Sequence, residues 1–211
     1  MRSEQAGRPF PRGGRGERRL SFPPDSVAGP SDPHAPSTTY HAPLYSAHGP
    51  EDWDFIHAVN SRGLFFALQA GARQMLRQTP LGDARPSGKI INMASIAGRG
   101  GRAMLGAYAA SKAAVINITQ TAAQEFAPRL TVNSICPGPV DTEMWKQIDQ
   151  EWSEQERRPL GSVWQDRVRS VPMQRGETPD DLTGMAVFLA SADSDYVTGQ
   201  SYNVDGGVVM S

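Results

Sequence analysis

The sequence has one cysteine, only three lysines and no long apolar run. Cys136 alone cannot form an internal disulfide, and it excludes zinc or iron–sulfur sites that need several cysteines, so we predict no metal site. No apolar run approaches the roughly 18 residues of a membrane span, and no signal-peptide core follows Met1. We therefore expect a cytoplasmic protein with no membrane partner. The formal net charge of −1 gives no general attraction for nucleic acid.

Arginine, proline and glycine are abundant, and they are unevenly placed. Arginine supplies 18 of the 21 basic residues, and residues 1–50 hold 9 of the 17 prolines and 6 of the 21 glycines. A proline-rich segment without apolar periodicity buries too little surface to offset its ordering entropy, so we predict that residues 1–48 are disordered and that the globular part spans 49–211. The arginine excess is typical of a GC-rich coding sequence. A frameshift, a wrong start or a decayed gene is our hypothesis for the origin of residues 1–48.

Helical and strand patterns alternate after residue 49. Pro50-Glu51-Asp52 opens a helix that we expect to run to about Gln78, because proline and acids favour a first turn. The further predicted elements are a strand at Lys89–Ala94, a helix at Ala107–Ala127, a strand at Leu130–Cys136, a polar helical region at 143–170, a helix from the Thr178 cap to Ser191 and a strand at Ser201–Val204. This alternation predicts an α/β fold with a parallel sheet covered by helices.

Tyr108 and Lys112 stand four residues apart, on one face of a predicted helix. A phenol has a pKa near 10, so it is a poor base at neutral pH unless a cation stabilises its phenolate. Lys112 is such a cation, and the pair could move a proton to or from a hydroxyl or carbonyl oxygen. This spacing is common by chance, so a packing tyrosine and a solvated lysine are the alternative.

Polar and flexible residues follow two of the predicted strands. Ser95 comes directly after the first strand, and ligands of open α/β sheets bind at the carboxyl ends of the strands. The alternative is a serine that caps loop backbone groups. The turn Pro137-Gly138-Pro139 lets backbone approach a ligand closely, and Thr142 can cap a helix or bind an anionic group. Asn60 lies in mid-helix, where a locally bonded amide is the alternative to a functional one.

Five blocks, taken in order, resemble the classical short-chain dehydrogenases/reductases over roughly residues 50–211. The blocks are Glu51-Asp52-Trp53-Asp54 with Val59-Asn60-Ser61-Arg62-Gly63, Ile90-Ile91-Asn92-Met93-Ala94-Ser95, Tyr108-Ala-Ala-Ser-Lys112, Val132-Asn133-Ser134-Ile135-Cys136-Pro137-Gly138, and Thr198-Gly199-Gln200 with Asp205-Gly206-Gly207. The resemblance is strongest to bacterial polyol dehydrogenases of the sorbitol dehydrogenase type. It implies NAD or NADP as the cofactor and a small alcohol or ketone as the substrate.

The resemblance also assigns roles to particular residues. The family's catalytic tetrad falls on Asn60, Ser95, Tyr108 and Lys112. It implies that Tyr108 is the acid/base and that Ser95 positions the substrate oxygen. Lys112 would lower the pKa of the tyrosine and bind the ribose on the nicotinamide side, and Asn60 would hold a water in a proton relay.

Further residues are implied at the cofactor and substrate ends. Those expected to line the nicotinamide end, besides Tyr108 and Lys112, are Pro137, Gly138, Val140 and Thr142. Glu143 and Trp145, together with Ser95, would contact a polyhydroxylated substrate. A surface helix start is the alternative for Glu143 and Trp145.

One part of the family pattern is missing. The family begins with T-G-x-x-x-G-x-G, a turn that holds the dinucleotide pyrophosphate, and no three early glycines here have that spacing. About three βα units, ~90 residues at ~30 each, have no counterpart. We therefore predict a truncated Rossmann-type doubly wound parallel sheet, its C-terminal part only. The strand Lys89–Ala94 then exposes an unpaired edge.

The sequence leaves three functions to consider, of which the third, nucleic-acid binding, has little support. The first is an NAD(P)-dependent oxidoreductase that interconverts an alcohol, such as the polyol sorbitol, and a ketone. The second is a non-catalytic pseudoenzyme, because the family's interface helices, which bear Asn60 and Tyr108, are retained. We expect a homo-oligomer or a hetero-oligomer with a paralogue. Arg12–Arg19 resembles a short RGG segment but lacks repetition and aromatics, so we predict no nucleic-acid partner.

Overall fold

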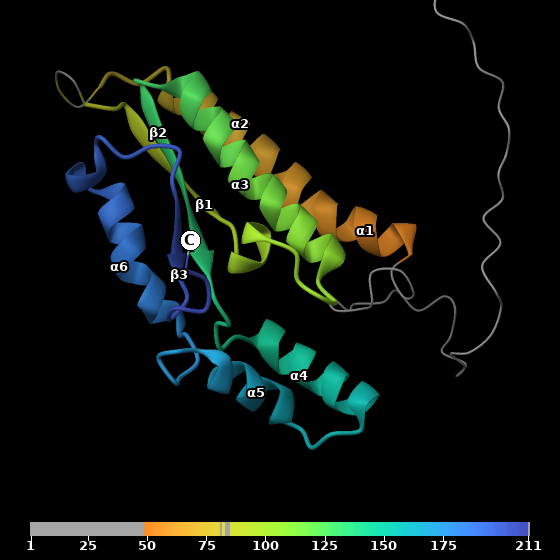
Figure 1. The fold of residues 1–211 in the computed structure, drawn as a ribbon. Coiled ribbons are helices and arrows are strands. Elements are labelled where there is room, and N and C mark those ends of the chain that lie inside the picture. Colours follow the sequence, from red (N-terminus) through yellow and green to blue (C-terminus); the bar gives the residue numbers. More distant parts are fainter. Residues whose placement is uncertain (1–48, 81, 83–84, 211) are drawn as a thin grey trace, which may run out of the picture. The chain divides into compact units, whose positions relative to one another are not determined.

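Three parallel strands form the centre of the described structure (Figure 1). This is a computed structural model that describes residues 49–80, 82 and 85–210, all within the unit Pro36–Ser211. The strands are β1 (Gly88–Met93), β2 (Leu130–Pro137) and β3 (Ser201–Val204), in the order β1-β2-β3. The predicted parallel α/β sheet is thereby confirmed. Residues 1–48, which we expect to be disordered, lie outside the described residues.

The register brings the carboxyl ends of the strands together. Met93 of β1 is opposite Ile135 of β2, and Pro137 of β2 is opposite Val204 of β3. The Ala94 N–H donates to the Ile135 carbonyl at 2.8 Å, so pairing with β2 continues just past β1. The segments that follow the three strands therefore begin at the same end of the sheet.

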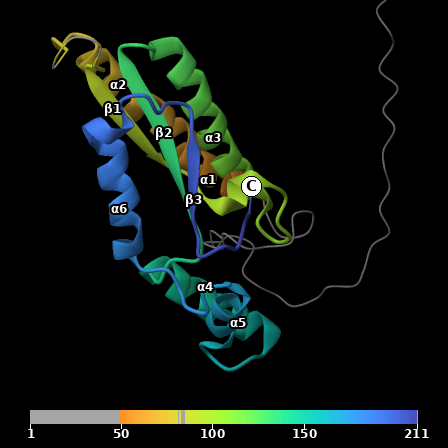
Figure 2. The same ribbon diagram turned by 60° about the vertical axis from the view of Figure 1, so that its left-hand side comes forward.

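Helices cover both faces of this sheet (Figures 1 and 2). One face carries α1 (Pro50–His57), the π-helical segment η1 (Ala58–Gly63), α2 (Leu64–Met75) and α3 (Gly106–Phe126), and the other carries α6 (Pro179–Ala190). Helices α4 (Glu143–Glu156) and α5 (Ser162–Ser170) pack on each other and follow the carboxyl end of β2. The short 3-10 helices are η2 (Ile96–Arg99) and η3 (Ala192–Ser194). No described helix is long and apolar enough to span a membrane.

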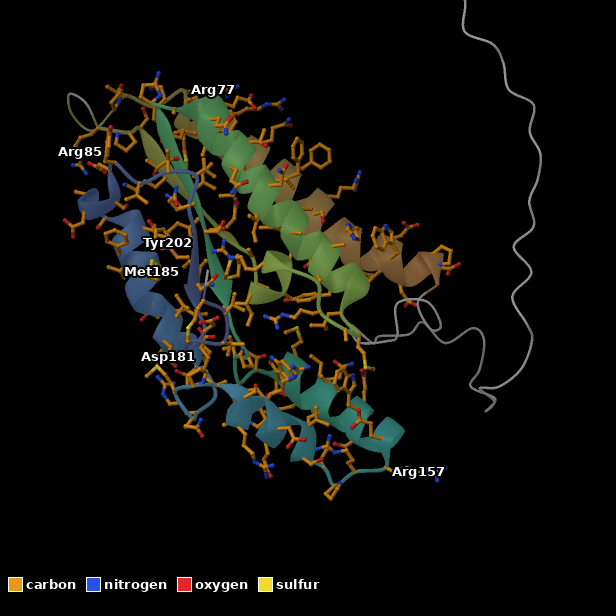
Figure 3. The ribbon with its side chains drawn as sticks, in the orientation of Figure 1. Arg77, Arg85, Arg157, Asp181, Met185 and Tyr202 are labelled. Carbon is orange, nitrogen blue, oxygen red and sulfur yellow. The ribbon has the colours of Figure 1, made fainter. Side chains whose placement is uncertain are left out.

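The polar region 143–170 forms two helices joined by a tight turn. Arg157, which Figure 3 shows at the far end of α4, has a left-handed φ of 53°, and Gly161 has a φ of 87°. The buried Asp149 carboxylate accepts the Gly161 and Trp164 N–H groups at 2.5 and 2.7 Å. This carboxylate caps the start of α5, where free N–H groups and the helix dipole favour a negative charge.

Strand β2 is the buried centre of the sheet, and a polar pair ties a helix to its neighbour β1. Val132 and Ile135 of β2 have no exposed surface. The Asn92 side-chain amide of β1 donates to Thr119 Oγ1 of α3 at 2.8 Å, and that hydroxyl donates to the Val115 carbonyl at 2.8 Å. One helix hydroxyl therefore accepts a hydrogen bond from the buried amide of Asn92.

We predict that Thr119→Val lowers the free energy of unfolding by about 1–3 kcal/mol, because it leaves the buried Asn92 amide without this acceptor. Thr121→Val, an exposed change in the same helix, is the matched control and should change little. Urea denaturation of both variants measures the difference. Equal stability of the two variants would contradict the assignment.

The outer edge of β1 has no strand partner among the residues that the structure describes. A groove of about 550 Å³ runs along this edge, and residues of η1 and α2 form its other wall. Alternate main-chain groups of a strand point to opposite edges, so one set of β1 groups faces away from β2. The groove brings β1 main chain, Asn60 and Lys112 to one surface.

Candidate functional site

Ser95 begins the loop that leaves the carboxyl end of β1. Its Oγ accepts the Ala97 N–H at 3.1 Å, and the residue is 9% exposed. Ser95 is thus the N-cap of η2, which is the capping role considered as an alternative. The same residue also lines the pocket described below, so capping fixes its position at that wall.

Gly98 lets η2 lie directly against α3. A Cβ at Gly98 would come within 2.6 Å of the Lys112 carbonyl carbon, a distance that real Cβ atoms do not reach. The close approach sets how the Ser95 turn sits relative to the helix that bears Tyr108 and Lys112.

We predict that Gly98→Ala lowers the free energy of unfolding by about 1–3 kcal/mol, because the added methyl group forces backbone apart. Gly100→Ala is the matched control, since its Cβ would meet nothing within 4 Å and its φ of −178° suits alanine. Thermal denaturation compares the two. A tolerated Gly98→Ala would show that η2 and α3 are not held in contact.

Lys112 is held between β1 and the ring of Tyr108. Its Nζ donates to the Met93 carbonyl at 3.1 Å and lies 5.7 Å from the centroid of the Tyr108 ring. Burial lowers the pKa of Lys112. The structure therefore places a partly desolvated amine next to a phenol, on the helical face that the i, i+4 spacing predicted.

Asn60 approaches α3 from η1, where the π-helical turn interrupts the long helix expected from Pro50 to Gln78. Its Nδ2 donates to Ser111 Oγ at 3.1 Å, and that hydroxyl donates to the Tyr108 carbonyl at 2.7 Å. Single π-helical turns occur frequently at functional sites. Ser111 was missed by the sequence reasoning, because its contact spans two helices far apart in the chain.

Two hollows flank the Tyr108–Lys112 face of α3. A pocket of about 110 Å³ is lined by Ser95, Tyr108 and Gly138, with apolar walls from Leu105, Met144, Trp145 and Ile148. Lys112 and Asn60 instead line the groove along β1. The structure thus places Ser95 with Tyr108 at the pocket, and Lys112 with Asn60 at the groove. The contact of the Lys112 Nζ with the Tyr108 ring links the two sets.

The turn after β2 approaches the loop after β3 closely. A Cβ at Gly138 would lie 3.0 Å from the Asp205 Cα, and the Gly138 N–H donates to Glu177 Oε2 at 2.7 Å. Thr142 is at the N-cap position of α4, but its hydroxyl donates to the Val140 carbonyl at 3.3 Å and makes no side-chain cap hydrogen bond. Among Pro137, Gly138, Val140 and Thr142, only Gly138 lines the pocket that contains Ser95 and Tyr108.

The structure separates the two residues expected to contact substrate at the start of α4. The Glu143 carboxylate is exposed and pairs with Lys146 at 2.5 Å, so it does not line the pocket. Trp145 does line it, and its ring packs on Trp164 with centroids 5.5 Å apart. For Glu143 the arrangement matches the alternative of a surface helix start.

Glu177 is a buried carboxylic acid that the sequence reasoning missed. Its main chain pairs with the turn after β2, with the Glu177 N–H donating to the Pro139 carbonyl and the Asp141 N–H donating to the Glu177 carbonyl. Burial raises the pKa of Glu177 to about 7, and the negative charges of Asp181 and Asp205 also raise this pKa. The hydrogen bond from the Gly138 N–H acts in the opposite direction and lowers it. Figure 3 labels Asp181, near the start of α6.

We predict that protonation of Glu177 stabilises the fold. Its folded pKa is above its ordinary value, so its contribution is complete below about pH 4.5 and is lost as the pH rises through about 7. Glu177→Gln, which keeps an acceptor for Gly138, should remove a fall of about 1–2 kcal/mol in unfolding free energy over this range. Urea denaturation at several pH values measures it, with exposed Glu125→Gln as the control. Identical pH slopes for wild type and Glu177→Gln would contradict the prediction.

The described fold and site define a class of protein, in which a parallel sheet covered by helices brings a serine, a tyrosine and a lysine together near the carboxyl ends of its strands. A family model described as enoyl-(acyl carrier protein) reductase matches residues 35–209. The chain belongs to the short-chain dehydrogenases/reductases.

Two curated relatives are polyol dehydrogenases. Sorbitol dehydrogenase of Cereibacter sphaeroides is 44% identical over 162 residues, which are 76% of this chain and 61% of that protein. Galactitol 2-dehydrogenase of Agrobacterium fabrum (strain C58 / ATCC 33970) is 45% identical over 162 residues, with the same 76% and 61% coverage. The chain therefore spans about three fifths of the length of these relatives.

Solved structures of similar fold belong to sugar and polyol dehydrogenases. Sorbitol-6-phosphate 2-dehydrogenase from Erwinia amylovora gives a TM-score of 0.73 at 29% identity, covering 81% of this chain and 65% of that one. NAD⁺-bound xylitol dehydrogenase gives 0.69 at 31% identity, covering 79% and 64%. Gluconate 5-dehydrogenase from Burkholderia cenocepacia J2315, in complex with NADP and tartrate, gives 0.66 at 33% identity, covering 80% and 60%.

Proposed function

We propose that the protein interconverts a hydroxyl group and a carbonyl group on a polyol-like substrate, with NAD or NADP as the hydride carrier. The observation that carries this proposal is the shared pocket of Ser95 and Tyr108, with Lys112 held beside the tyrosine ring. The dehydrogenase relatives support the reaction class, and their names support a polyhydroxylated substrate.

The chain's own residues handle the proton at the reacting oxygen. The Ser95 hydroxyl donates a hydrogen bond to that oxygen, and Tyr108 takes its proton during oxidation or returns it during reduction. Lys112 stabilises the phenolate because its cation lies beside the ring. Asn60 of η1 is held by Ser111 of α3, the helix that bears Lys112, and the side-chain carbonyl oxygen of Asn60 can order a water at Lys112.

The residues at this end of the sheet fit the nicotinamide half of a dinucleotide. Lys112 makes no ion pair among the described residues and faces the groove along β1, so its Nζ suits ribose hydroxyls. Gly138 lines the pocket of Ser95 and Tyr108, and Pro137, Val140 and Thr142 lie near it in the chain. When bound, the nicotinamide accepts or returns the hydride. The glycine turn for the pyrophosphate is missing from the sequence, so we expect weak binding that needs millimolar coenzyme.

We predict that Tyr108→Phe lowers the rate of coenzyme reduction with a polyol by about 100-fold or more, since it removes the proton acceptor and keeps the ring. Tyr196→Phe, at a fully exposed tyrosine, is the control and should keep the wild-type rate. Absorbance of the reduced coenzyme, at millimolar coenzyme and polyol, gives both rates. Full activity in Tyr108→Phe would exclude Tyr108 as the acid/base.

A second candidate is a non-catalytic partner that assembles with a full-length relative. The observation that favours it is a set of exposed apolar side chains on α1, η1 and α2, comprising Trp53, Phe55, Val59, Phe65 and Phe66. Such patches mark protein–protein contacts. Light scattering on the chain, alone and mixed with a full-length polyol dehydrogenase, tests it. A mixed assembly without turnover of its own would favour this candidate over the enzyme.

A further inference from the structure

Two arginines face the same pocket as Ser95 and Tyr108. Arg102 lies in the loop between η2 and α3, and Arg167 lies in the last turn of α5. The sequence reasoning gave neither a role. They bring two guanidinium groups to a pocket whose other walls are mainly apolar.

Neither arginine has a charge partner within the part of the chain that the structure describes. Nearby arginines are paired: Arg158 and Arg169 with Asp166, and Arg175 with Asp181. No aspartate or glutamate is found among the described residues that line the pocket. The positive charge at this wall is therefore not neutralised by the described residues of the protein.

The position of Arg167 is fixed by packing. Its guanidinium lies over the Trp152 ring, 5.9 Å from the centroid, and Trp152 belongs to the buried cluster between α4 and α5. Burial lowers the pKa of Arg167, and the nearby charge of Arg102 lowers it further. Two like charges that face one partly closed pocket repel each other, and an anion between them removes this cost.

We propose that the pocket binds a substrate that carries an anionic group, a carboxylate or a phosphate, and that Arg102 and Arg167 recognise this group. Guanidinium groups suit both anions because they donate paired hydrogen bonds in a fixed plane. The reacting hydroxyl then lies at Ser95 and Tyr108, and the carbon chain lies against Trp145 and Ile148. The preferred substrate class is then a sugar acid or a phosphorylated polyol, and a neutral polyol binds more weakly. The position of the reacting hydroxyl rests on the proposed function, whereas the binding of the anion does not.

Calorimetric titration of the full chain without coenzyme tests this inference. The probes are D-gluconate for a carboxylate, sorbitol 6-phosphate for a phosphate, and sorbitol as the uncharged reference. We expect at least one anionic probe to bind about tenfold or more tightly than sorbitol, and to weaken as salt is added. The anionic probe that binds more tightly identifies the recognised group as a carboxylate or as a phosphate. Equal affinity for all three probes would overturn the proposal.

Single variants assign the binding to the arginines. Arg167→Gln should weaken the preferred anionic probe about tenfold or more and leave sorbitol unchanged. Arg169→Gln, at an exposed arginine of the same helix, is the matched control and should change nothing. Arg102→Gln lies in an exposed loop, so it keeps the test valid if Arg167→Gln does not fold. Anion affinity that survives both changes would overturn the proposal.

Two further outcomes separate this inference from others. Tyr108→Phe should keep the anion affinity while losing turnover. A wild-type chain that binds the anion but shows no turnover would count against the proposed function and not against this inference. If Arg167→Gln weakens NADP and leaves gluconate and sorbitol 6-phosphate unchanged, the arginines serve a coenzyme phosphate and the proposal is overturned.

Discussion

The approach of η2 to α3 is the constraint on which the candidate site depends. Gly98 has no room for a side chain against the Lys112 main chain, and Lys112 reaches back to the Met93 carbonyl at the end of β1. Helix α3 is thereby fixed over the strand that delivers Ser95. Because β2 is buried and paired on both sides, this end of the sheet is rigid enough to hold a serine and a tyrosine at one pocket.

The structure divides the chemistry between two hollows on either side of one helical face. The groups proposed to move the proton, and two arginines without a charge partner among the described residues, face the smaller pocket. Lys112 and Asn60 face the groove along β1. A phenol that lies between such a pocket and a partly desolvated amine is suited to proton transfer at an alcohol or carbonyl oxygen. Membership in the short-chain dehydrogenases/reductases supports the same proposed reaction class. The two arginines are the basis of the proposed preference for an anionic substrate, whereas sorbitol and galactitol, after which two curated relatives are named, are uncharged.

Local sequence patterns predicted much of the fold, whereas contacts between residues distant in the chain could not be predicted. Apolar runs gave the strands, and a cap with a first-turn proline gave the start of α6 at Pro179. The i, i+4 spacing placed Tyr108 and Lys112 on one face. The burial of Glu177 could not be predicted, because it arises from segments distant in the chain. The arginines could not be predicted, because only the folded chain shows that Arg102 and Arg167 face one pocket whose described lining residues include no acid.

Transfer of deuterium is the most direct test of the claim that this end of the sheet carries out hydride chemistry. A polyol or sugar acid deuterated at the carbinol carbon is incubated with the chain and NAD or NADP at millimolar concentration, and the coenzyme is analysed by mass spectrometry. The account predicts reduced coenzyme that carries one deuterium and accumulates with time. A folded chain that binds the substrate and leaves the coenzyme unlabelled would contradict it.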